Sequence, residues 1–141
     1  MKIGLKVKLV TVGFLVSVLA GCASVPLDPG AEKVVFTTTS LPKACQSLGQ
    51  ISSTDVNGVT TSYTSHANLM TMEINALKNR ARALGGNVVV LTGHHTVYVH
   101  GARRQVATHV LDGIAYVCPA NVLRRLPNEN SADISDAPVK R

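Results

Sequence analysis

Four of the five histidines of this chain lie between positions 94 and 109, a density that could support metal coordination. They are His94, His95, His100 and His109. A tight hairpin turn at residues 101–102 would pair strand positions whose numbers sum to about 203, so that His94 lies opposite His109 with Tyr98 on the same face. Cross-strand neighbours are close enough for two imidazoles to share one metal ion. The spacing therefore predicts a metal site at His94 and His109, to which His95 or His100 could add a ligand.

This hypothesis depends on the strand register, because a one-residue slip moves the pair apart. The alternative is that the four residues are exposed or half-buried hairpin histidines near a polar edge. Asp112 is the only carboxylate near them in the strand, and His66, which precedes a helix, is expected to add little. Glu73 is expected to be a surface residue of that helix. Both interpretations stay open on the sequence.

The sequence lacks the motifs of the common enzyme classes. No serine lies in a G-x-S-x-G turn, and no pair of acidic residues suggests glycosidase chemistry. The glycines before Asn87 follow a helix and lead into a strand, which is the reverse of the phosphate-binding order. We therefore expect no enzyme, with no catalytic residue and no cofactor.

Residues 1–21 have the three parts of a lipoprotein signal peptide. Three lysines form a charged start, residues 9–19 are a compact apolar run, and small residues come directly before Cys22. The run is shorter than the roughly 20 residues that a transmembrane helix needs. The L-A-G-C sequence at residues 19–22 resembles a bacterial lipobox, which implies cleavage before Cys22 and lipidation at that residue. The alternative is an ordinary secretory signal, but the cysteine directly after Leu-Ala-Gly favours lipidation.

The rest of the chain is expected to form a lipidated cysteine and tether (residues 22–32), a small domain (33–126) and a disordered tail (127–141). Alanine at position 23 favours the outer membrane, with the domain facing the periplasm. The expected partners are the membrane, through the lipid anchor, and an envelope protein. Loss of the three leader lysines lowers the formal charge from +6 to +3, so the mature chain gives no indication of nucleic-acid binding.

The two remaining cysteines, Cys45 and Cys118, are expected to form one structural disulfide, because the periplasm is oxidising. The chain-entropy model gives such a long closed loop about 4 kcal/mol of stabilisation. The alternative is a reactive thiol pair or a pair of metal thiolates, which a C-x-x-C spacing would support. That spacing is absent from the sequence.

One amphipathic helix and several strands are predicted between these features. The helix covers residues 67–84, where apolar residues recur at helical spacing and two glycines follow. Its apolar stripe consists of Met70, Ile74, Leu77, Ala81 and Leu84. Strands are expected at residues 34–39, 45–54, 87–92, 94–100, 103–111 and 114–118, with a bulge or turn at 112–113. The predicted fold class is α+β, in two layers, with the helix packed on a mostly antiparallel sheet and one disulfide.

Three segments together resemble the YjeI-type lipoproteins, a domain-of-unknown-function family. They are C-x-x-L-G from Cys45, LKNRARALGGNVV at residues 77–89 and GIAYVCP at residues 113–119. The chain is also distantly similar to the domain of RcsF, an outer-membrane lipoprotein that senses envelope stress, although it has one predicted disulfide where that domain has two. The YjeI-type family brings no activity with it, and the similarity to RcsF implies only a class of function, an envelope binding module. The lipobox, the tether, the small domain with one disulfide and the missing catalytic motifs favour an outer-membrane lipoprotein that acts as a non-enzymatic binding, integrity or stress-sensing module. The alternative function is a periplasmic metal-binding module that uses the hairpin histidines.

Overall fold

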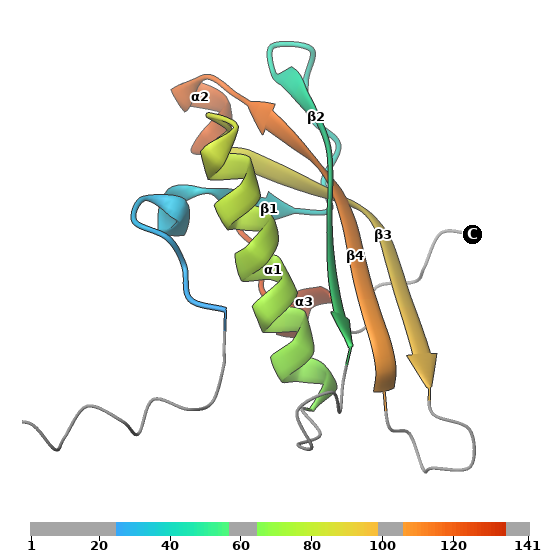
Figure 1. Cartoon of the computed structure of the whole chain (residues 1–141). Helices are drawn as coiled ribbons and strands as arrows, with labels where there is room; N and C mark the ends of the chain where they lie inside the picture. The colour runs from blue at the N-terminus through green and yellow to red at the C-terminus, as the bar shows by residue number, and fades with distance from the viewer. Residues whose placement is uncertain (1–24, 57–64, 99–105, 135–141) are drawn as a thin grey trace, which may run out of the picture.

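A four-stranded sheet with one long helix on one face forms the centre of the molecule (Figure 1). The computed structural model describes residues 25–56, 65–98 and 106–134. The strands are β1 (Val35–Thr37), β2 (Gln46–Val56), β3 (Val88–Tyr98) and β4 (Val106–Val117), in the order β1-β3-β4-β2. β1 is parallel to β3, and the other two pairings are antiparallel. The predicted α+β class, with a helix on a mostly antiparallel sheet, is confirmed.

Helix α1 (His66–Ala83) follows the predicted boundaries to within one residue. The Ser65 side chain caps its first turn by accepting a hydrogen bond from the Asn68 N–H, and Gly85 follows its end with a φ of 82°. Four members of the predicted stripe are buried against the sheet, but Leu84 is 52% exposed. Leu84 was expected in the stripe, but it is the C-cap residue, where the helix ends and no longer presents its side chain to the sheet.

The hairpin strands β3 and β4 are each continuous, where the sequence predicted interruptions. One register shift lies in β4 at Ala107, because Val97 pairs with Thr108 and Tyr98 pairs with Val106. The other lies in β3, opposite residues 112–113, because Leu91 pairs with Gly113 and Gly93 pairs with Asp112, so that Thr92 is an extra residue. The expected bulge at 112–113 is therefore wrong. Beyond Thr92, His94 pairs with Leu111. The expected turn at residues 101–102 lies outside the described residues.

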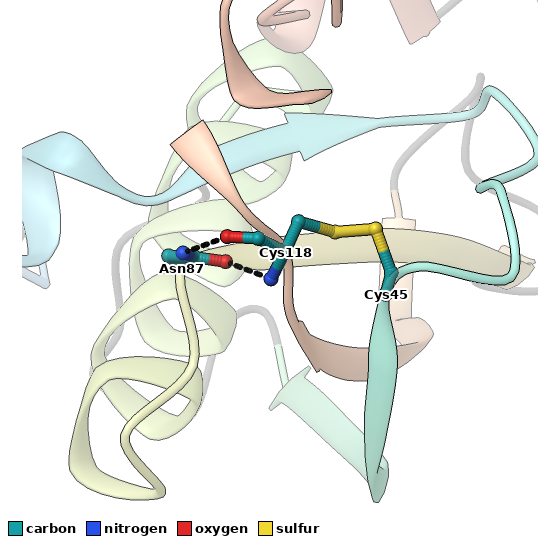
Figure 2. Close-up of a disulfide and its surroundings, with 3 residues drawn as sticks. All are labelled: Cys45, Asn87 and Cys118. Carbon is teal, nitrogen blue, oxygen red and sulfur yellow. Dashed lines mark hydrogen bonds between the residues drawn. A yellow bond between two sulfur atoms is a disulfide. The ribbon is translucent and has the colours of Figure 1, made fainter. Parts of the chain in front are cut away.

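The Cys45–Cys118 disulfide is present and links the start of β2 to the end of β4 (Figure 2). Asn87 lies next to it and makes two hydrogen bonds with the backbone of Cys118. Its side-chain N–H donates to the Cys118 carbonyl at 2.8 Å, and its side-chain oxygen accepts from the Cys118 N–H at 2.8 Å. The amide thus extends the β3–β4 pairing by one position, which holds the cysteine in place.

Both ends of the described chain pack on the domain, in contrast to the expected tether and tail. The tether was expected to include residues up to 32, but the short helix η1 (Ala31–Lys33) buries Ala31 completely. After the short helix α2 (Ala120–Leu123), the chain returns to β1, where the Glu129 N–H donates to the Phe36 carbonyl at 2.7 Å. Helix α3 (Ser131–Ile134) then places Ile134 in the core, with 1% exposed. Residues 127–134 are therefore ordered, and the expected disordered tail is wrong for them.

The predicted signal peptide and Cys22 lie outside the described residues, as do residues 135–141. Within the described part of the chain, no helix is long and apolar enough to span a bilayer.

Candidate metal centre

Three histidines from three different elements meet at the end of the molecule where α1 begins. His66 is the first residue of α1, His94 lies in β3 and His109 lies in β4. We call these three residues the histidine cluster. The Nε2 atom of His109 lies 2.9 Å from Nε2 of His66 and 2.7 Å from Nε2 of His94. The cluster therefore presents its ring nitrogens to one shared point, and one ligand atom from each residue lies within 4.8 Å of the other two.

A buried carboxylate orients the central histidine. Nδ1 of His109 contacts Oε2 of Glu73, which lies on the sheet-facing side of α1. His109 is 0% exposed and Glu73 is 2% exposed. Because a carboxylate accepts hydrogen bonds, this contact places the His109 proton on Nδ1 and leaves the lone pair of Nε2 facing the other two histidines.

The electrostatic environment keeps the other two rings neutral. Burial, together with the neighbouring histidines His109, His66 and His95, lowers the pKa of His94 from 6.5 to about 4. Burial and His109 also lower the pKa of His66. Neutral imidazole is the form that binds a metal, so these shifts leave the cluster ready for a cation at neutral pH.

The arrangement is close to the geometry of a three-histidine zinc site. Zn–N bonds of about 2.0–2.1 Å at tetrahedral angles place ligand nitrogens roughly 3.3 Å apart. The two Nε2–Nε2 distances of 2.7 and 2.9 Å are shorter than this by about half an ångström, so the rings would have to separate slightly to admit an ion. The rings of His66 and His94 are nearly parallel, with centroids 5.7 Å apart, and the ring of His109 lies edge-on to His66. A metal ion at the shared point would bind the three Nε2 atoms, of which that of His109 contacts the other two directly.

The structure brings together the two histidines that the sequence singled out, although through a different register. His109 is the partner of Thr96, so the expected pairing of His94 directly opposite His109 is wrong. The offset is two positions, which leaves both side chains on the same face of the sheet and still within reach. Thr96 shares that face, and its hydroxyl lies 3.2 Å from Nε2 of His94.

The other two hairpin histidines are not part of the described cluster. His95 is exposed and, as the next residue along β3, faces the opposite side of the sheet. There it lines a surface pocket together with Ser52 and Asp112. His100 lies outside the described residues.

Sequence reasoning missed two members of the site, His66 and Glu73. His66 was expected to add little, and Glu73 was expected at the surface, but both face the sheet from α1. They are seven residues apart, which is two helical turns, so they lie on the same side of the helix as the apolar stripe. A histidine and a glutamate in register with a buried stripe were the signal that could have identified them.

Comparison with known families places the site in a domain of unknown function. A family model described as a domain of unknown function (DUF4156) matches residues 25–118, more than half of the chain. All three histidines, Glu73 and both disulfide cysteines lie inside the matched range. The match supports neither the narrower YjeI-type resemblance nor the distant one to RcsF. No curated protein and no solved structure matches the chain.

Proposed function

Since the chain belongs to the DUF4156 family, a domain of unknown function, we propose a function from the geometry of its site: the domain binds one divalent transition-metal ion, Zn²⁺ first of all. The ligands are the Nε2 atoms of His66, His94 and His109. The observation that carries the proposal is the convergence of these three nitrogens from α1, β3 and β4.

The buried Glu73 supports this proposal. Metal-ligating histidines commonly donate their second ring N–H to a carboxylate, which fixes the tautomer and raises the basicity of the ligating nitrogen. Glu73 is placed to be this carboxylate for His109, because its Oε2 contacts the Nδ1 of that ring. A carboxylate buried to 2% exposure is costly unless it is paired, so its placement against His109, which is also fully buried, fits a metal-binding role.

We also propose that this domain is attached to the outer membrane through lipid on Cys22, facing the periplasm. The support comes from the charged start, the apolar run and the lipobox of residues 1–22. In this setting the protein is a non-enzymatic envelope module that binds metal, and an envelope protein is its expected partner. An intact disulfide fits an oxidising compartment.

A zinc titration with a matched pair of variants tests the metal site. Purified mature protein should bind one Zn²⁺ per chain, and His94→Ala should lose that binding. His95→Ala is the control, because His95 is the adjacent histidine of the same strand but faces away from the cluster. Circular dichroism should show that both variants are folded. Equal binding by the two variants, or no binding by the parent protein at micromolar zinc, would contradict the proposal.

A further inference from the structure

We propose that the side of α1 that carries the N-terminal segment lies directly against a lipid surface. This inference rests on the lipid anchor at Cys22 in the proposed function. The sequence suggested a tether up to residue 32 that lifts the domain off the membrane, but the structure leaves almost no chain for such a tether.

The N-terminal segment is part of the domain from Val25 onward. The Asn75 side chain donates a hydrogen bond to the Val25 carbonyl at 2.9 Å. One turn further along α1, the Asn79 side chain donates to the Pro26 carbonyl at 2.9 Å and accepts from the Asp28 N–H at 2.8 Å. Two asparagines of α1 therefore hold this segment along the helix, and in Figure 1 the segment that begins at residue 25 lies beside α1.

The covalent length between anchor and domain is short. Three Cα–Cα steps separate Cys22 from Val25, and a fully extended chain spans at most about 3.3–3.6 Å per residue, so the reach is roughly 11 Å. Helix α1, with 18 residues at about 1.5 Å each, is roughly 27 Å long. The reach is less than half the length of the helix. A cysteine whose lipid chains lie in the bilayer must therefore hold the side of α1 next to Val25 at the level of the headgroups.

The exposed side chains near this point suit a headgroup region. Leu27 is a large apolar residue with 37% of its surface exposed. The Arg82 guanidinium lies against Gly30, and Arg82 and Lys33 are both exposed cations that can contact lipid phosphate. Asp28 and Glu32 balance part of this charge, so the short anchor, rather than charge attraction, decides the orientation.

This orientation also places the histidine cluster near the membrane. His66 lies nine residues before Asn75 on α1, which corresponds to roughly 14 Å along the helix axis. The metal centre of the proposed function would thus lie within about one helix length of the lipid surface, at the end of α1 where the hairpin strands meet it.

The absence of tryptophan from the chain allows a direct test with single-tryptophan reporters. Mature lipidated protein is reconstituted into phosphatidylcholine vesicles with and without brominated acyl chains, which quench nearby tryptophan. Leu27→Trp should lose fluorescence in the brominated vesicles. His95→Trp, on the face of the sheet away from α1, should keep its fluorescence. Lys33→Trp is a second reporter on the proposed face, in case Leu27→Trp does not fold.

Mass spectrometry of the same samples separates the failure of this inference from that of the anchor. If Cys22 carries lipid and both faces are quenched equally, or neither face is, the proposed orientation is overturned while the anchor stands. If Cys22 carries no lipid, both the orientation and the anchor are overturned, and the zinc titration still decides the metal site independently.

Discussion

Glu73→Gln should weaken zinc binding without unfolding the domain. Glutamine has nearly the same size as glutamate, and its carbonyl oxygen can still accept the Nδ1–H of His109. The substitution therefore removes the negative charge and retains most of the packing around α1. The carboxylate is 2% exposed and the imidazole is 0% exposed, so water screens their interaction weakly.

The expected size follows from the role of the carboxylate behind a metal ligand. Loss of such a partner commonly costs about 10- to 100-fold in metal affinity. This corresponds to about 1.4–2.7 kcal/mol of binding free energy. A competition titration against a chromophoric chelator, at constant pH and ionic strength, measures the change in Kd directly.

The matched control is Glu32→Gln, which removes the same charge from an exposed position in η1. Its zinc affinity should equal that of the parent protein. If Glu73→Gln binds zinc as tightly as the parent, the carboxylate does not support His109 as a ligand. If both variants weaken binding equally, the effect comes from net charge and the argument from the His109–Glu73 contact is refuted.

Three further predictions concern stability. Cys45→Ser/Cys118→Ser should lower the free energy of unfolding by about 4 kcal/mol in the chain-entropy model, because the bond closes a loop with a sequence separation of 73, and urea unfolding with and without reductant measures this. The metal-free protein should keep its full stability above pH 6.5 and lose part of it as the pH falls toward 4, because burial and neighbouring histidines lower the pKa of His94 to about 4 and the unfolded chain then binds the extra proton. Urea unfolding at several pH values should show a smaller loss for His94→Ala, and an equal loss would contradict this assignment. Ile134→Ala should destabilise the domain by about 2–4 kcal/mol, since it empties a core position, whereas a thermal midpoint equal to that of the parent would indicate that α3 does not pack on the core.

Local patterns predicted the helix and the fold class well. The stripe from Met70 to Ala81 repeats at helical spacing, and the residues that surround it cap the helix at both ends. The disulfide followed from compartment and cysteine number alone. The parallel pairing of β1 with β3 did not follow, because it depends on where the chain returns after α1, which is a matter of tertiary packing.

The site was predicted in part for the same reason. Alternation along the hairpin places His94 and His109 on one face, and an even offset in register preserves that result. On the turn side of the histidines, the extra residue Ala107 between the Tyr98–Val106 and Val97–Thr108 pairs shifts the register by one position, and nothing in the local sequence marks it as a bulge. His66 and Glu73 join the site only because α1 packs across β3 and β4, so a search along the strands could not include them.

Predictions from composition were wrong for both ends of the described chain, because the packing of these segments depends on single contacts. Residues 127–134 are polar, yet one apolar side chain, Ile134, reaches the core, and Glu129 pairs with the edge of β1. The segment before η1 contains proline and glycine, yet its carbonyls are held by asparagines of α1. The average polarity of a segment gives no information on such single hydrogen bonds and buried side chains.

The metal centre and the disulfide would restrain opposite ends of the same strand. His109 lies near the start of β4 and Cys118 directly follows its end, which is a separation of nine residues, or about 30 Å. The disulfide joins β4 to β2 but does not restrain α1. A metal ion held by His66, His94 and His109 would join α1 to β3 and β4 at the other end, where the described contacts of the helix start are noncovalent. Metal binding therefore has a structural consequence here, because it fixes α1 to the sheet at the end that the disulfide does not reach.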